Sequence, residues 1–184
     1  MRKTEKKTGN SPDAGTMHLV EVVDALGRPL LVMPAESVHR QGLNHKIILV
    51  LLYDLQGRLY LQKRAASKTV YPGRWDLSAT GHVQAGEAAM DAAVRELREE
   101  LGVEPVSIKE LCRVAACAET GHAFTTLFTT GRISAVPSPN PAEVAEGMFI
   151  SADDLDATVT HFGEMLTPAV HWAYTNGFLF RRSA

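Results

Sequence analysis

The hydrophobic and polar positions predict short strands along most of the chain. Residues 46–53 (KIILVLLY) form an unbroken apolar run, which is typical of a strand buried on both faces. Residues 58–63 alternate instead, with Leu59 and Leu61 on one side and Tyr60 on the other, as expected for a hairpin partner. The other predicted strands cover 18–23, 29–32, 107–118, 124–133 and 147–150.

The strongest helical periodicity lies in the middle of the chain. Residues 88–101 are rich in helix-forming residues and carry an apolar stripe on one side. The stripe consists of Met90, Val94, Leu97 and Leu101. Gly102 is suited to end this helix, because glycine readily adopts the left-handed conformation found just after helix C-termini.

Shorter helices and a long loop complete the pattern. Further helices are predicted at 34–41 before Gly42, from Ala152 after a Ser151 cap, and at 163–175. Residues 69–82 are interpreted as a loop, because they contain the Pro72-Gly73 turn signal. Strands with helices interposed predict an α/β fold in which a mixed β-sheet is sandwiched between α-helices.

Length and composition indicate one ordinary domain. The chain has 184 residues, of which 45% are hydrophobic and 22% charged. We expect a single domain at 18–184 and a disordered, basic and polar tail at 1–17. This tail has no apolar segment of a secretory signal, and no apolar run in the chain is long enough to cross a bilayer.

Charge and cysteine content exclude several classes of partner. A net charge of −2 gives no sign of a nucleic-acid polymer or a membrane surface as partner. Cys112 and Cys117 are too few for a disulfide framework, and we expect both to be reduced strand residues. A cytoplasmic location is the default expectation.

The end of the central helix carries an unusual set of acids. At about 100° per residue, Glu96, Glu99 and Glu100 share one face of the helix. These carboxylates repel one another, and they lie at the helix end whose dipole prefers cations. A bound divalent cation would reverse both penalties. The pattern therefore indicates a metal site rather than a helix selected for stability alone.

The same stretch, GHVQAGEAAMDAAVRELREELGV at 81–103, resembles the Nudix box, the signature of the Nudix hydrolase superfamily. That signature is glycine, five residues, glutamate, seven residues, then Arg-Glu-apolar-x-Glu-Glu-x-Gly-apolar, and every specified position is present here. A solvated acidic helix end would not explain Gly81, Glu87 and Arg95. The resemblance implies the Nudix fold, with the box as a loop-helix-loop on one edge of the sheet.

The resemblance also implies roles for the acids. The positions matching Glu96 and Glu100 are the usual metal ligands in Nudix hydrolases, and the carbonyl matching Gly81 often completes the shell. The position matching Glu99 joins them, or orients or deprotonates water. Mg²⁺, or Mn²⁺, is the expected cofactor, because Mg²⁺ is usually held by one or two carboxylates together with substrate phosphates.

The remaining box residues and the chemistry follow from the same family. Arg95 is expected to form a salt bridge with Glu87, which holds the loop on the helix. The implied reaction is displacement at a phosphorus of a small-molecule diphosphate, with metal-assisted activation of water. The implied enzyme is a MutT-like pyrophosphohydrolase that acts on phosphoric anhydride bonds. Nudix proteins often form dimers, so a homodimer stays open.

A basic segment before the box refines the resemblance. The cations in QKRAASKTVYPGRW are Lys63, Arg64, Lys68 and Arg74. The segment, together with HRQGLNHK and TGHVQAGE, is similar to isopentenyl-diphosphate isomerase and its hydrolase-like relatives. In the isomerase, the residues matching Arg64 and Lys68 contact the substrate diphosphate. His45 and His82 match two of its metal-ligand histidines, but lone histidines are more often structural.

This sequence departs from the isomerase at its acid and base. The isomerase has an essential cysteine where this chain has Thr80, which cannot supply the same acid. The stretch 120–123 lacks the isomerase's Glu-x-Glu pair, and Glu119 is the nearest carboxylate. The isomerase box is usually degenerate, whereas this box is complete. We therefore expect hydrolysis of a nucleoside-diphosphate-type or other small organic diphosphate rather than isomerisation.

Two alternatives and two further acids stay open. An isomerase-like enzyme is one alternative, and a non-catalytic Nudix ligand-binding domain is the other, although such domains tend to lose box carboxylates that this chain keeps. Glu143 and Glu146 lie in a region that sometimes supplies an extra ligand or base in Nudix proteins. Ordinary surface acids are the simpler interpretation of this pair.

Overall fold

A seven-stranded mixed sheet forms the centre of the protein. The computed structural model describes residues 18–105, 107–117 and 120–180. The strands of the sheet are β3 (His45–Tyr53), β4 (Leu59–Arg64), β5 (Trp75–Asp76), β6 (Ala79–His82), β7 (Lys109–Val114), β8 (Ala123–Arg132) and β9 (Val144–Ile150).

β3 is the middle strand of this sheet. It runs parallel to β8, which in turn pairs with β7. Its other edge pairs antiparallel with β6, from Ile47↔His82 to Val50↔Ala79, and meets β4 at Tyr53↔Leu59. β4 continues the sheet by pairing with β9 along most of its length and with β5 near its end. β6 and β4 therefore follow one another along the same edge of β3, with β6 at residues 47–50 and β4 at Tyr53.

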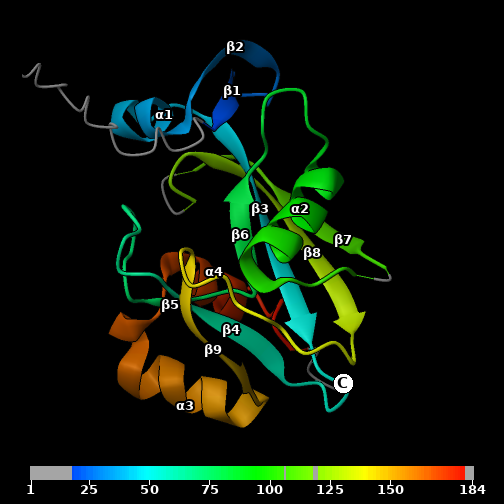
Figure 1. Cartoon of the computed structure of the whole chain (residues 1–184). Coiled ribbons are helices and arrows are strands. Elements are labelled where there is room, and N and C mark those ends of the chain that lie inside the picture. The colour runs from blue at the N-terminus through cyan, green and yellow to red at the C-terminus, as the bar shows by residue number, and fades with distance from the viewer. Residues whose placement is uncertain (1–17, 106, 118–119, 181–184) are drawn as a thin grey trace, which may run out of the picture.

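Helices cover both faces of the sheet, so the predicted α/β sandwich is confirmed (Figure 1). The box helix α2 (Ala89–Leu101) packs its buried residues with Ile48, Val50 and Leu52 of β3 in one cluster. Leu49 and Leu51 point into the opposite cluster, which includes residues of the C-terminal helices. The prediction that β3 is buried on both faces is therefore correct.

The other helices and the N-terminal hairpin lie around this frame. The hairpin consists of β1 (Leu19–Val23) and β2 (Pro29–Pro34), and the short helix α1 (Ala35–Gln41) follows it. The C-terminal elements are α3 (Ala152–Phe162), the 3-10 helix η1 (Gly163–Met165) and α4 (Pro168–Thr175). Ser151 caps α3 as predicted, because its side chain accepts a hydrogen bond from the Asp154 N–H.

Two predicted elements were wrong. The region 69–82 is not wholly a loop, because it contains β5 and β6, which are too short to show an alternating pattern and form by pairing with β4 and β3. The predicted helix at 163–175 is broken into η1 and α4. Thr167 is extended (φ −75°, ψ 158°) because it precedes Pro168, whose ring disfavours a helical conformation at the preceding residue.

Smaller corrections concern exposure and strand ends. Met90 is 46% exposed, and α2 buries Ala92 and Ala93 in addition to Leu97 and Leu101. β9 begins three residues before the predicted 147–150 strand, because residues 145–148 are exposed and give no apolar signal. β7 ends at Val114, so Cys112 lies in a strand and Cys117 does not.

The remaining expectations concern residues outside the described ranges, the cysteines and membrane-spanning helices. The predicted tail at 1–17 and Glu119 lie outside the described residues. Within the described chain, both cysteines are free. The described helices include none that is both long and apolar enough to span a membrane.

Gly147→Ala is expected to destabilise the sheet. A Cβ at this position in β9 would lie 1.7 Å from the Tyr60 hydroxyl oxygen and 2.3 Å from its Cζ. The Tyr60 ring is buried among residues of the α2 cluster, so it has little room to move. We expect the free energy of unfolding in urea to fall by about 1–3 kcal/mol. The loss should be smaller in a Tyr60→Phe background, which lacks the hydroxyl, and equal losses would contradict this packing argument.

Candidate metal and diphosphate site

The box helix is placed so that its acids face β6. α2 packs into the core through the side that carries Leu97 and Leu101, and it ends at Gly102, whose φ of 63° is left-handed as predicted. The neighbouring face carries Glu96 and Glu100, and both side chains contact β6. The two carboxylates therefore pack directly against the backbone of β6.

Glu100 is a buried carboxylate with two defined donors. It is 3% exposed, and its Oε2 accepts the Thr80 backbone N–H at 3.1 Å and the Gln62 amide N–H at 3.0 Å. Burial raises the pKa of Glu100 to about 8, the charge of Glu96 adds to this effect, and the two hydrogen bonds oppose it. An anionic Glu100 is therefore costly at this position unless positive charge comes close.

Glu96 occupies space that only a glycine at position 81 leaves free. A Cβ on Gly81 would lie 2.0 Å from Glu96 Oε1 and 2.1 Å from Cδ, so any larger residue would displace this carboxyl group. The Glu96 side chain is 14% exposed, and burial raises its pKa. Glycine at the start of the box thus allows Glu96 to lie directly against the β6 backbone.

Arg95 ties the box loop, the helix and β6 together. Its guanidinium donates to both Glu87 carboxylate oxygens, at 2.8 and 3.0 Å, and to the His82 carbonyl oxygen at 2.9 Å. It also contacts Glu96 at 2.7 Å and Glu99 at 3.2 Å. The salt bridge expected between Arg95 and Glu87 is therefore present, and hydrogen bonding to Glu87 is the main reason that the pKa of Arg95 is raised.

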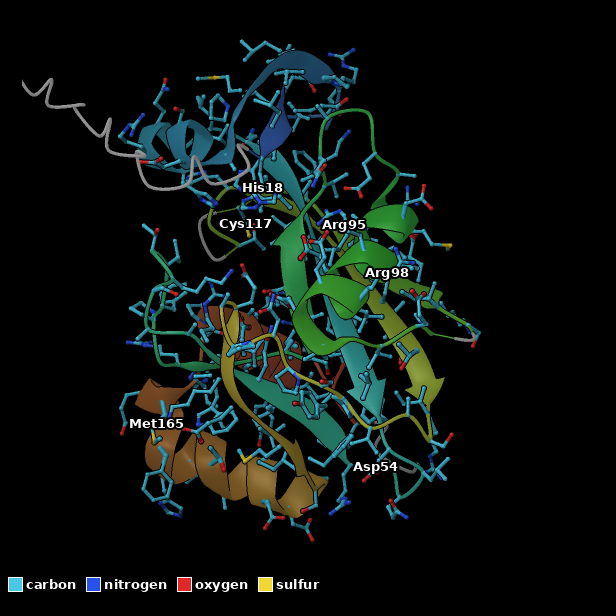
Figure 2. The ribbon with its side chains drawn as sticks, viewed as in Figure 1. His18, Asp54, Arg95, Arg98, Cys117 and Met165 are labelled. Atoms are coloured by element: carbon cyan, nitrogen blue, oxygen red, sulfur yellow. The ribbon has the colours of Figure 1, made fainter. Side chains whose placement is uncertain are left out.

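Two arginines on α2 lie in different surroundings. Arg95 lies where the helix meets β6 and is 18% exposed, whereas Arg98 is 58% exposed and pairs with Glu104 (Figure 2). Glu99 is half exposed, and its hydrogen bond is to Arg95. Of the three box acids, Glu99 is thus the one most open to solvent.

The two predicted phosphate-binding residues already have acidic partners. Arg64 Nη1 lies 3.2 Å from Asp76 Oδ2, its Nε donates to the Val70 carbonyl, and its side chain is 14% exposed. Lys68 forms an ion pair with Glu143. Burial lowers the pKa of Lys68, and the nearby negative charge of Glu100 opposes this shift. The structure therefore brings Lys68 toward the box carboxylates. Arg64 instead binds the β4–β5 loop at Val70 and strand β5 at Asp76.

The acids at the start of β9 pair with this basic segment. Glu143 contacts Lys68, and Glu146 contacts Lys63 at 2.8 Å. The Glu143 backbone carbonyl also accepts the Ala65 N–H at 3.0 Å. These contacts hold the β4–β5 loop against Glu143 and the first residues of β9.

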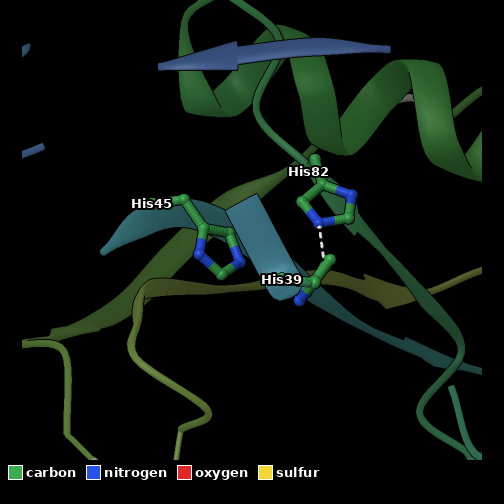
Figure 3. A group of neighbouring side chains, drawn as sticks. All are labelled: His39, His45 and His82. Atoms are coloured by element: carbon green, nitrogen blue, oxygen red, sulfur yellow. Dashed lines mark hydrogen bonds between the residues drawn. The ribbon is translucent and has the colours of Figure 1, made fainter. Parts of the chain in front are cut away.

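Three histidines from separate elements meet at the far end of β6 (Figure 3). His39 comes from α1, His45 begins β3 and His82 ends β6. One nitrogen of each ring lies within 4.8 Å of the others, and the Nε2 atoms of His39 and His82 are 2.7 Å apart. The position of His39 could not be predicted, because no local pattern indicates that α1 folds back toward β6.

The histidine rings have the properties of metal ligands. His45 Nδ1 donates to the Leu43 carbonyl at 2.9 Å, which leaves Nε2 as the free acceptor. Burial lowers the pKa of His82 to about 3 and also lowers the pKa values of His39 and His45. The rings are therefore neutral at physiological pH, as metal coordination requires.

Two buried polar atoms mark these two places. Among the described residues, the buried side-chain atoms without a hydrogen-bond partner are His45 Nε2 and Gln62 Oε1. One lies in the histidine cluster and the other lies beside Glu100. Because buried polar atoms are nearly always paired in proteins, each indicates a site for a ligand or water. Sequence reasoning did not single out Gln62, although a polar residue on the α2-facing side of β4 is a usable signal.

Comparison with known proteins agrees with this geometry. The model of the NUDIX domain family matches residues 43–170. An uncharacterised Nudix hydrolase of Pseudomonas aeruginosa, PA4841, is 43% identical over 97 residues, which cover 53% of this chain and 57% of that protein. The chain thus matches little more than half the length of that relative. An isopentenyl-diphosphate Delta-isomerase of Streptomyces griseus is 34% identical over 164 residues, covering 84% of this chain and 83% of the isomerase.

A solved structure shares the fold over most of the chain. The crystal structure of DR0079 from Deinococcus radiodurans superposes with a TM-score of 0.68 at 26% identity, covering 77% of this chain and 88% of the other. The family model alone spans more than half of the 184 residues, and it includes the complete box. The chain belongs to the Nudix family, and its likeness to a Nudix hydrolase supports a hydrolase that acts on phosphoric anhydride bonds.

Proposed function

We propose that this protein is a metal-dependent pyrophosphohydrolase that cleaves the diphosphate linkage of a nucleoside-diphosphate-type or other small organic diphosphate. The observation that carries the proposal is the convergence of Glu96 and Glu100, both largely buried, against the backbone of β6. Two neighbouring carboxylates whose pKa values are raised by burial have a strong electrostatic demand for a cation.

The residues present suit Mg²⁺ or Mn²⁺. Glu96 and Glu100 would supply carboxylate oxygens, and the third ligand expected from the sequence is the Gly81 carbonyl. Oxygen ligands with room for water and phosphate are those that Mg²⁺ prefers. When bound, the ion would polarise phosphoryl oxygens and lower the pKa of the attacking water.

The chain's own residues would supply the remaining chemistry. Glu99 is the acid most open to solvent, so it is suited to orient water or accept its proton. Lys68 lies near Glu96 and Glu100 and would neutralise charge on a substrate phosphate. Arg64 is held by Asp76, so its contact with phosphate would use the part of its guanidinium that this pair leaves free.

Arg95 and Glu87 would act by holding the site in shape. The Arg95 guanidinium joins the loop that carries Glu87 to the carbonyl of His82 and to Glu96. Catalytic groups need to be held within a fraction of an ångström by such supports. A cytoplasmic location, a small-molecule diphosphate as partner and a homodimer complete the proposal as expectations from the sequence.

The histidine cluster favours a second candidate, an isomerase-like activity. His39, His45 and His82 could hold a second ion, for which neutral imidazole nitrogens suit a metal such as Zn²⁺. Thr80 argues against isomerisation, because a hydroxyl cannot replace a cysteine as acid. A non-catalytic binding domain is disfavoured, because every box carboxylate is kept.

Glu100→Gln should abolish most of the hydrolytic activity. The substitution removes one negative charge from the proposed metal site, and we expect phosphate or pyrophosphate release to fall about 100-fold or more. The assay would use Mg²⁺ and Mn²⁺ with a panel of nucleoside and isoprenoid diphosphates. Glu104→Gln, at an exposed acid that pairs with Arg98, is the matched control. No activity on any substrate, or an unchanged rate for Glu100→Gln, would disprove the proposal.

Arg95→Met should destabilise the fold far more than Arg98→Met. Removal of Arg95 leaves the largely buried Glu87 and Glu96 carboxylates without their cation, whereas Arg98 is exposed. We expect the free energy of unfolding in urea to fall by roughly 2 kcal/mol for Arg95→Met, since partial exposure reduces the full penalty, and by less than about 0.5 kcal/mol for Arg98→Met. Similar losses for the two variants would refute the supporting role of Arg95.

His45→Ala tests whether the histidine cluster holds a separate ion. We expect the wild-type protein to bind Co²⁺ with the visible absorption of a nitrogen-ligated site, because the cluster presents three imidazole nitrogens. This signal should be lost in His45→Ala and kept in Glu100→Gln.

Proton exchange into isopentenyl diphosphate without phosphate release would support the isomerase-like candidate, and its absence would leave hydrolysis as the function of the box.

A further inference from the structure

A buried glutamine lies between β4 and the box helix. Gln62 is 1% exposed and follows Tyr60 on the side of β4 that faces the α2 cluster. Leu59 and Leu61 lie on the opposite side of β4, in the other core cluster, whereas Tyr60 packs in the α2 cluster on the side of Gln62. A leucine or methionine at position 62 would suit burial on the α2 side. The amide therefore needs an explanation other than filling the core.

The hydrogen bonds fix how this amide is oriented. When a bound cation keeps Glu100 ionised, its carboxylate can only accept hydrogen bonds, so the amide nitrogen of Gln62 is the atom that faces it. Its Nε2 donates to Glu100 Oε2 at 3.0 Å, and the Thr80 N–H donates to the same oxygen at 3.1 Å. Both donors thus act on Oε2, and within the described residues no hydrogen bond is made to Glu100 Oε1.

The other end of the amide is unpaired. Gln62 Oε1 is buried and has no hydrogen-bond partner among the described residues. An unpaired buried carbonyl lowers stability, so its presence here is better explained by a ligand or water at the carboxylate site than by folding. The unpaired acceptor belongs to the same side chain that orients Glu100.

We propose that Gln62 is a positioning residue for Glu100. The glutamine and the Thr80 N–H hold Oε2, which would leave Oε1 for a divalent cation, and Gln62 Oε1 would accept a hydrogen bond from a water molecule at the carboxylate site. Side chains that orient metal ligands in this way commonly set metal affinity. The inference rests on the proposed function, because it requires that Glu100 bind a divalent cation.

The test is the affinity of the full-length protein for Mn²⁺, measured by electron paramagnetic resonance of the free ion. Ions whose binding is lost in Glu100→Gln define the carboxylate site, which separates them from any Mn²⁺ at the histidine cluster. Gln62→Met keeps the size of the side chain and removes both hydrogen-bonding groups. We expect its dissociation constant for this site to be about 10 to 100 times that of the wild type.

Further variants separate positioning from a structural role. Gln56→Met, at an exposed glutamine in the β3–β4 turn, should bind Mn²⁺ like the wild type. Thermal unfolding without metal checks that each variant is folded. If Gln62→Met does not fold, Gln62→Asn, whose shorter amide cannot reach Glu100, should also bind more weakly.

The outcomes distinguish the inference from the proposed function. If the wild type has no Mn²⁺ site that Glu100→Gln removes, the proposed metal site and the role of Gln62 both fail. If that site exists and the folded Gln62 variant binds Mn²⁺ as tightly as the wild type, only the role of Gln62 is overturned. A lower unfolding temperature with unchanged Mn²⁺ affinity also overturns that role, because it shows that Gln62 only stabilises the fold.

Discussion

The fork of hydrogen bonds made by Arg95 is the constraint on which the rest of the site depends. One guanidinium reaches the loop through Glu87, the strand through the His82 carbonyl, and the helix through Glu96. Each of these partners is an acceptor, and together they would repel one another without a cation between them. Arg95 thus offsets the repulsion between these oxygen atoms and holds the loop, strand and helix in fixed positions. It makes no contact with Glu100, whose charge would be neutralised by another cation.

Several groups around Arg95 and the two candidate sites are buried in ways that lower the stability of the fold. Glu100 is buried with a raised pKa. The unpaired buried atom of Gln62 lies beside Glu100, and that of His45 lies in the histidine cluster. The other buried side-chain polar atoms of the described residues are paired, and such exceptions are expected at functional sites. The large apolar clusters on both faces of β3 offset these local costs, since they hold the sheet and α2 in place independently of the site.

The sequence contained most of the fold and part of the site, for physical reasons. The spacing of Leu97 and Leu101 predicted α2, and the apolar run of β3 predicted a strand covered on both faces, because these signals are local and repeat along the chain. His39 and Gln62 escaped prediction because their neighbours lie in other elements. The ion pair of Arg64 with Asp76 was equally hidden, since it depends on the pairing of β5 with β4, strands too short to carry a pattern.

Strand β6 links the two candidate sites, and its sequence explains how one sheet can serve different chemistries. The Thr80 N–H holds Glu100, the absent side chain of Gly81 makes room for Glu96, and the ring of His82 enters the histidine cluster. Only the side chain at position 80 is free to change without disturbing these contacts, because Thr80 acts on Glu100 through its backbone. The side chain at this position can therefore change its chemistry while the carboxylate frame stays intact.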